Sequence, residues 1–341
     1  MRIYWRLHLL IGKKMDLCAE KLVCFLTVIL LGLLKHGVCS TSSNEYMKRE
    51  HSLIRPFQGV GINLPYWDFL GHTMVTSNYI RLTPDLQSKS GALWNYSPVM
   101  TRNWEVHVTF KVHGKGNELY GDGFAIWYTK ERMQTGPVFG SKDYFSGLAV
   151  ILDTYSNHNG PHNHQHPYLS AMINNGSWTY DHDRDGTHTQ LAGCEVRFRN
   201  VDYDTHVSIR YENDVLSIST DMENRGEWKN CFVVNDVELP TGYFLGLSAT
   251  TGDLSDSHDI LGIKFYDLDI NVTPEEISAR STIVPRAKTY EPPREHKDDP
   301  KPGMSNVKIF FILLFGMLVA IAGAIFAISY FKEKNSRKRF Y

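Results

Sequence analysis

The stretch WEVHVTFKV, residues 104–112, alternates apolar and polar side chains along its whole length. Successive side chains of a β-strand point to opposite faces of a sheet, so this period predicts a strand with one face in a core and the other in water. The apolar positions are Trp104, Val106, Val108, Phe110 and Val112.

Segments of the same kind follow along the chain, separated by turn signals such as GDG, NNG, DRDG and PTG. They cover residues 123–129, 147–153, 168–174, 195–200, 206–212, 215–220, 243–249 and 260–270. No long helical period interrupts them. Many short strands with this punctuation predict an all-β fold, a sandwich or a jelly roll.

The N-terminus has the order of a secretory signal peptide. The apolar run at residues 22–34 is short, basic residues precede it, and small residues follow it near Cys39. Residues 1–40 are therefore predicted to be a signal peptide, with Met15 as an alternative start. An uncleaved signal anchor is the competing interpretation.

A second apolar run, Ile309 to Phe331, carries no charged residue and is long enough to cross a bilayer as a helix. Residues 332–341, which follow this run, are rich in Lys and Arg, and this charge predicts that they lie in the cytosol. Together with the signal peptide, this run predicts a single-pass type I membrane protein.

Between these ends, residues 44–275 have the size of one β-domain, and residues 276–306 form a stem rich in Pro and charge that cannot bury a core. The formal net charge of -1 gives no sign of a nucleic-acid partner.

Of the five cysteines, only Cys194 and Cys231 lie outside the signal region. In an oxidising lumen they are expected to form a disulfide, with two free thiols as the alternative. Asn175 begins the sequence NGS and is the preferred glycosylation acceptor, because Pro follows the other two such motifs.

Residues 153–168, DTYSNHNGPHNHQHPY, combine two kinds of metal signal. Asp153, Tyr155 and Asn157 alternate at a strand end, as oxygen ligands of calcium would, whereas a histidine-rich tract is typical of zinc or copper sites. A second acidic loop, at residues 180–188, offers His182 and Asp185.

Residues 51–270 resemble the leguminous-type lectins of the animal secretory pathway. The motifs that carry the resemblance are HSLIRPFQGVG, YIRLTPDLQSKSGALW, YGDGFAIWYT, GPVFGSKDYFSGLAVILDTYSN, PYLSAMINNGSWTYDHDRDG, LAGCEVRFRN and PTGYFLGLSATTGDLSDSHDI. The short stem and the terminal RKRFY are similar to those of the short-stemmed members of this family.

The resemblance implies a concave jelly roll that binds high-mannose N-glycans with the help of calcium. The implied calcium ligands are Asp153, the carbonyl of Tyr155, Asn157 and Asp185. The residues implied to face mannose are Ser88, Asp122, Tyr155, Asn157, His182, Gly252, Asp253 and Leu254. Protonation of His182 is expected to weaken binding in acidic compartments, although the direction of its pKa shift does not follow from the sequence.

The chain also departs from the family pattern. Plant members hold a second, transition metal with a Glu where this chain has Ile151, so that site is expected to be absent. The histidines of the loop lie outside every family motif and are interpreted as a solvated loop, with a zinc site as the alternative. They are His158, His162, His164 and His166.

The expected function is non-enzymatic: a cargo receptor or quality-control factor in the membranes of the ER, the ER–Golgi intermediate and the Golgi. The tail is expected to govern sorting, with possible coat-protein partners, through Arg337, Lys338, Arg339, Phe340 and Tyr341. A glycoside hydrolase is the alternative enzyme class, but no E-x-D-x-E run supplies its paired carboxylates. A purely structural ectodomain would leave the acidic and Gly-Asp-Leu motifs unexplained.

Overall fold

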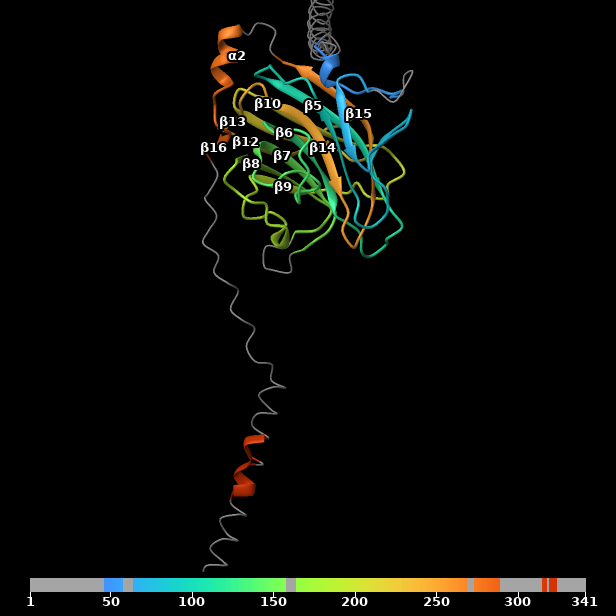
Figure 1. The fold of residues 1–341 in the computed structure, drawn as a ribbon, viewed down its shortest axis with the longest axis vertical. Coiled ribbons are helices and arrows are strands. Elements are labelled where there is room, and N and C mark those ends of the chain that lie inside the picture. The colour runs from blue at the N-terminus through green and yellow to red at the C-terminus, as the bar shows by residue number, and fades with distance from the viewer. Residues whose placement is uncertain are drawn as a thin grey trace, which may run out of the picture. The chain divides into compact units, whose positions relative to one another are not determined.

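The computed structural model describes residues 46–57, 64–157, 164–268, 273–288, 315–317 and 319–323. These residues fall into two separate units that divide between Pro292 and Pro293. The N-terminal unit contains two large sheets (Figure 1). The predicted all-β sandwich is confirmed.

The first sheet has the strand order β1-β4-β14-β6-β7-β8-β9, with all neighbours antiparallel. Its strands are β1 (Trp67–Gly71), β4 (Ser90–Asn95), β6 (Gly123–Thr129), β7 (Ser146–Asp153), β8 (Tyr168–Asn175), β9 (Ala192–Glu195) and β14 (Phe244–Thr250).

The second sheet has the order β12-β11-β10-β5-β15-β3-β2. Its strands are β2 (Met74–Val75), β3 (Ile80–Thr83), β5 (Trp104–His113), β10 (Thr205–Glu212), β11 (Val215–Asp221), β12 (Lys229–Val234) and β15 (Ser257–Asp267). The late strands β14 and β15 therefore lie in the interior of their sheets, each between strands formed from earlier parts of the chain.

The burial of each strand follows its sequence pattern. In β5 the buried and half-buried positions alternate, as the opening stretch predicts. Strands β6, β7 and β8 are buried on both faces: one face packs against the second sheet, and the other carries a smaller core under loop residues. The smaller core includes Trp94, Trp127, Phe139, Phe145 and Ile151.

One strand prediction is wrong. Residues 195–200 were expected to form a strand, but β9 ends at Glu195 and beyond it Arg199 makes only an isolated bridge to Val112. The alternation at these positions has another cause, because Val196 and Phe198 pack into the main core.

The predicted disulfide between Cys194 and Cys231 is confirmed, with Cα atoms 5.7 Å apart. It joins β9 to β12. Asn175 is exposed at the end of β8, so its glycosylation stays a prediction that the structure permits.

The chain after the sandwich folds back onto it. Helix α2 (Pro274–Arg280) begins at a capping box on Thr273, and Arg280 pairs with Asp214 and donates to the Oη of Tyr211 at 2.9 Å. Further on, β16 (Arg286–Ala287) pairs with β13 (Val237–Glu238). The start of the predicted stem therefore contacts the domain, and the boundary between residues 275 and 276 stays a prediction.

Residues 315–317 and 319–323, inside the predicted membrane run, are helical. Within the described part of the chain, no helix combines the length and the apolar character needed to cross a bilayer. The predicted signal peptide, the tail residues 332–341 and two of the loop histidines, His158 and His162, lie outside the described residues.

Candidate functional site

The ends of four strands meet at one edge of the first sheet. Gly123, at the start of β6, pairs with Asp153 at the end of β7 and with Thr250 at the end of β14, while Asp153 also pairs with Tyr168 at the start of β8. A Cβ on Gly123 would lie 2.3 Å from the Leu152 carbonyl oxygen, so only glycine fits this close approach. The loops that follow these strands carry most of the predicted site residues.

Two buried carboxylates form the centre of the site. Asp153 is 7% exposed, and Asp185, in a left-handed conformation after the short 3-10 helix η2 (His182–Arg184), is 4% exposed. Burial, and then the charge of Asp185, raises the pKa of Asp153 well above its usual range. Among the described residues, neither carboxylate forms an ion pair with Lys or Arg. Such a pair is a suitable place for a cation.

The other predicted calcium ligands hold these carboxylates in place. The backbone N–H of Tyr155 donates to Asp153 Oδ1 at 3.0 Å, and that of Asn157 donates to Asp185 Oδ1 at 2.9 Å. The four predicted ligands thus belong to one cluster. Each of them is predicted to coordinate the ion through an oxygen atom, and calcium prefers oxygen ligands.

The predicted sugar-facing residues border this cluster. Thr154 N donates to the Asp122 carbonyl oxygen at 3.0 Å, which places Asp122 next to the end of β7. A Cβ on Gly252 would lie 3.4 Å from Asp122 Oδ2, and Ser88 N donates to the Gly252 carbonyl oxygen at 3.0 Å. Burial, and secondarily the charge of Asp253, raises the pKa of Asp122 to about 6.

Gly121 connects the two groups of residues. A Cβ at this position would lie 3.1 Å from the Cβ of Tyr155 and 3.6 Å from the Cβ of Leu254. Tyr155 and the Gly-Asp-Leu segment therefore pack close to the same glycine, so a displacement of one segment would affect the position of the other.

The segment 252–254 is held by an anchor that the sequence did not reveal. Arg199 donates to Asp256 at 2.7 to 3.0 Å, and the two side chains are 7% and 0% exposed. Ser255 Oγ donates to Asp85 at 2.7 Å, and Gln87 Nε2 donates to the Asp253 carbonyl oxygen at 2.6 Å. The middle of the Gly-Asp-Leu segment and the two residues that follow it are thereby held in place.

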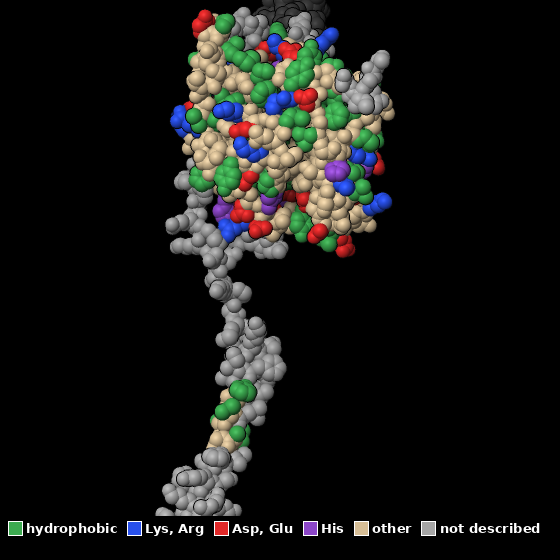
Figure 2. Space-filling model, viewed as in Figure 1, with side chains coloured by type: hydrophobic (Ala, Val, Ile, Leu, Met, Phe, Trp, Pro, Cys, Tyr) green, Lys and Arg blue, Asp and Glu red, His purple; other side chains and the backbone are tan. Residues whose placement is uncertain are grey.

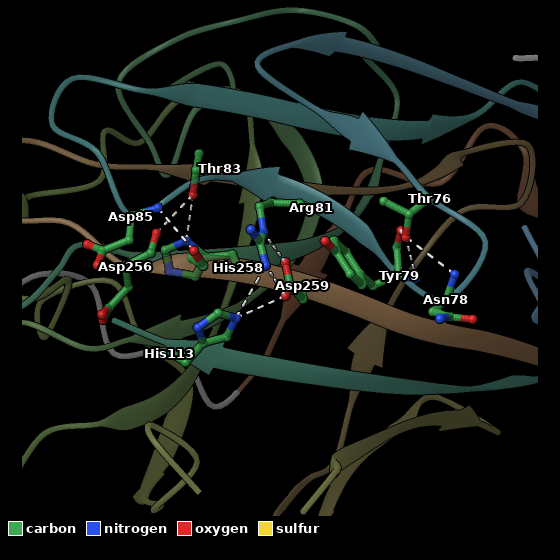
Figure 3. A network of polar contacts seen from close by, with 11 residues as sticks. Thr76, Asn78, Tyr79, Arg81, Thr83, Asp85, His113, Asp256, His258 and Asp259 are labelled. Carbon is green, nitrogen blue, oxygen red and sulfur yellow. Dashed lines mark hydrogen bonds and ion pairs between the residues drawn. The ribbon is translucent and has the colours of Figure 1, made fainter. Parts of the chain in front are cut away.

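A polar network continues from this anchor along β3 and β15 (Figure 3). Arg81 forms a two-point ion pair with Asp259 at 2.7 and 2.8 Å, and His113 Nε2 lies 3.0 Å from the same carboxylate. Next to it, His258 Nδ1 lies 2.7 Å from Thr83 Oγ1. Burial lowers the pKa of His258 to about 3, so this imidazole is neutral in the folded protein.

His182 lies at the start of η2, within the same group of loops. Its Nε2 lies 3.0 Å from the Pro137 carbonyl oxygen, and its ring contacts Phe139 and Tyr180 at centroid distances of 5.5 and 4.7 Å. A carbonyl only accepts, so Nε2 carries the hydrogen and Nδ1 is the acceptor. Burial lowers the pKa of His182, which settles the direction that the sequence left open.

The expectation of a solvated histidine loop is wrong for His166. Its side chain is 5% exposed, and its Nε2 lies 4.0 Å from Asp153 Oδ2 and 3.9 Å from Asp185 Oδ2. Figure 2 shows histidine side chains beside acidic ones at the lower end of the domain. One feature of the sequence could have revealed this placement. His166 lies two residues before Tyr168, and Tyr168 pairs with Asp153 where β7 meets β8.

Comparisons with known proteins agree with this arrangement. The sequence model of the legume-like lectin family matches residues 44–274. Mouse (Mus musculus) vesicular integral-membrane protein VIP36 is 47% identical over 323 residues, 92% of this chain and 90% of that protein. Human (Homo sapiens) VIP36-like protein is 46% identical over 302 residues, 87% and 86% of the two chains.

Among solved structures, the crystal structure of the VIP36 exoplasmic/lumenal domain in its Ca2+/Man2-bound form is similar, with a TM-score of 0.67 and 52% sequence identity. The match covers 71% of this chain and 98% of that one.

Proposed function

This chain belongs to the legume-like lectin family, and on that premise we propose that it is a calcium-dependent lectin for high-mannose N-glycans that carries glycoproteins between the ER and the Golgi. The observation that carries the proposal is the buried pair Asp153 and Asp185, which lies beside the loop of residues 252–254 at one sheet edge. The similar VIP36 domain was solved with calcium and mannose bound.

Calcium, when bound, supplies a positive charge that oxygen ligands surround. The chain's own part is to bury Asp153 and Asp185 together and to hold Tyr155 and Asn157 next to them through their backbone N–H groups. Burial, and then the charge of Asp185, raises the pKa of Asp153, so the two carboxylates are unfavourable together without a cation. The proposed ligand set therefore couples calcium binding to the order of both loops.

Sugar hydroxyls need fixed donors and acceptors, and the border of the cluster offers both. Asp122 contributes a carboxylate, and His182 contributes its Nδ1 as an acceptor. Residues 252–254 contribute backbone groups, and their anchors at Asp256 and Gln87 restrict their motion before the sugar arrives. Less conformational entropy is then lost on binding.

A role in binding rather than catalysis agrees with the family, which is one of carbohydrate-binding proteins. A glycosidase needs one carboxylic acid and one free carboxylate about 5 to 10 Å apart. Asp153 and Asp185 are proposed to hold calcium, so neither is free to act as an acid or a nucleophile.

The transport role rests on the ends of the chain. A signal peptide at residues 1–40 and a membrane run at residues 309–331 would place the lectin domain in the lumen, and the tail would face the cytosol. Its basic residues and its terminal Phe340 and Tyr341 are proposed to bind coat proteins for retrieval and export. The mouse relative's name, vesicular integral-membrane protein, supports this setting.

Retention of the full-length chain, solubilised in detergent, on a mannose column tests the lectin. We expect retention with calcium and release on addition of a calcium chelator. A glycan array with and without calcium then identifies the preferred branch. Retention that is unchanged by the chelator would remove calcium from the mechanism, and no binding to any mannose glycan would remove the lectin function.

A further inference from the structure

His166 has an unusual environment for an imidazole. Its side chain is 5% exposed, and neither ring nitrogen forms a hydrogen bond. Its Nε2 lies 4.0 Å from Asp153 Oδ2 and 3.9 Å from Asp185 Oδ2. These distances exceed the reach of a hydrogen bond. A buried nitrogen that faces two carboxylates at this spacing leaves room for an atom between them.

A second imidazole lies beside it. The ring of His164 is 4.8 Å from that of His166 and stacks on the ring of Tyr168 at 3.6 Å, with an angle of 2° between the planes. This stack fixes the plane of His164 next to the start of β8. Ligand atoms of His164, His166 and Asp185 all lie within 4.8 Å of one another.

We propose that His164, His166 and Asp185 bind a divalent transition-metal ion of the zinc class beside the proposed calcium ligands, with Asp185 belonging to both ligand sets. Two imidazole nitrogens and one carboxylate match the ligand preferences of zinc. Calcium prefers oxygen ligands throughout, so the two sites select different ions. Ile151, which stands where plant members have a metal-binding Glu, is fully buried and is not among the proposed ligands.

Zinc binding requires the three ligand atoms to move slightly closer together. Two atoms bonded to one zinc ion at about 2.1 Å each are at most about 4.2 Å apart, so the widest spacing must shorten by several tenths of an ångström. His164 and His166 precede β8, whereas Asp185 follows η2. The bound ion therefore ties the chain entering β8 to the segment that carries His182. Three protein ligands leave one position for water.

Asp185 connects this site to the proposed calcium site. Its Oδ1 accepts from the N–H of Asn157, and its Oδ2 faces His166. An ion on the Oδ2 side adds positive charge beside two buried carboxylates and limits the motion of Asp185. Zinc binding goes beyond the proposed lectin function, and its readout is the metal rather than the sugar.

The test is titration of the full-length chain with zinc, in detergent micelles with excess calcium, followed by calorimetry and by metal analysis after dialysis. We expect one zinc per chain in addition to calcium. His166→Gln and His164→Gln are each expected to weaken zinc binding by about tenfold or more, because loss of supporting groups alone costs metal sites this much. His72→Gln, at an exposed histidine, is the matched control and should bind zinc as the parent does.

Cobalt(II) tests the parent without any substitution, since it takes similar ligands and its visible absorption reports its coordination. Intense bands of four-coordinate cobalt support the site, and the weak spectrum of the hydrated ion opposes it. Zinc that binds only by displacing calcium overturns the proposal, as does equal zinc binding by the parent and His166→Gln. If the chain binds one zinc ion but is not retained on mannose, the zinc site is supported and only the proposed lectin function is wrong.

Discussion

Cys194 and Cys231 connect the two sheets of the sandwich at one side. Cys194 lies in β9, the last strand of the first sheet, and Cys231 lies in β12, the first strand of the second. The two cysteines are 37 residues apart in the sequence, so the bond closes a loop of moderate length. The covalent link holds together edge strands that share few other contacts.

Replacing both cysteines with alanine is expected to lower the free energy of unfolding by about 3 to 4 kcal/mol, because the unfolded chain regains the entropy of an open loop. Urea unfolding of the parent and the double variant measures this difference. A midpoint that does not change would show that the bond adds nothing to the stability of the folded sandwich.

Asp153→Asn is expected to abolish calcium-dependent mannose retention while the domain stays folded, because it removes a charged ligand without a change in volume. The exposed carboxylate Asp183 provides the matched control, since Asp183→Asn makes the same charge change near the site. Calcium affinity by calorimetry and retention on mannose measure the outcome. If Asp153→Asn binds mannose like the parent at the same free calcium, the site assignment is wrong.

Mannose binding is expected to fall as the pH falls through the lowered pKa of His182. Above that pKa the imidazole is neutral, so Nδ1 would accept from a sugar hydroxyl while Nε2 donates to the Pro137 carbonyl oxygen. Below it, Nδ1 carries a proton and the acceptor is lost. The shift is downward from 6.5, so binding should persist at neutral pH and weaken only below about pH 6.5.

Affinity measured from about pH 7.5 to about pH 5 at saturating calcium, for the parent and for His182→Gln, separates this mechanism from others. The Gln amide keeps a donor and an acceptor but does not titrate. An equally steep fall in the variant would exclude His182 as the group responsible and would direct attention to Asp122, whose pKa lies at about 6.

His258 predicts a loss of stability in acid. Its pKa is about 3 in the folded protein and about 6.5 in the unfolded chain, so between these values the unfolded state binds more protons. The free energy of unfolding therefore falls as the pH decreases below about 6.5, by about 1.4 kcal/mol per pH unit at most.

Asn at position 258 can keep the bond to Thr83, because the amide overlaps the Nδ1 position of the imidazole, but it does not titrate. Denaturant unfolding from about pH 7 to about pH 4 should show a shallower loss of stability for His258→Asn than for the parent. Parallel curves for the two proteins would mean that the acid sensitivity arises elsewhere.

Replacing Arg337, Lys338 and Arg339 with serine is expected to reduce residence in the ER, because the basic cluster is proposed to bind retrieval coats. Fluorescence microscopy of the tagged chain and analysis of glycan processing on cargo report the steady-state distribution. The competing account is that these charges only set the topology. If neither the distribution nor the topology changes, the proposed sorting role of the basic cluster is wrong.

The sequence predicted the strands whose own pattern is strong and missed those that depend on distant partners. The alternation of residues 104–112 corresponds to β5, and residues 123–129 correspond to β6. The short strands β2 and β13 have two residues each, so no period exists to detect. Residues 195–200 show the converse error: their alternation reflects the packing of Val196 and Phe198 into the core, and beyond Glu195 they form no continuous strand.

The site residues inferred from the family resemblance do cluster, although their individual roles stay predictions. His166 was missed because its loop consists almost entirely of polar residues, and such composition is typical of solvent-exposed chain. Its burial follows from tertiary structure: the pairing of β7 with β8 returns the loop to Asp153. The anchor between Arg199 and Asp256 spans 57 residues and likewise has no local signal.

The central position of β14 and β15 has a consequence for biosynthesis. The chain emerges from the ribosome N-terminus first, so β4 and β6 are made long before β14, which must insert between them. A nascent chain that stops before residue 244 has no β14 to join β4 to β6 and lacks the Gly-Asp-Leu segment as well. The proposed sugar site is thus incomplete until almost the whole lectin domain has been synthesised, and an unfinished chain would not bind the glycoproteins that mature around it.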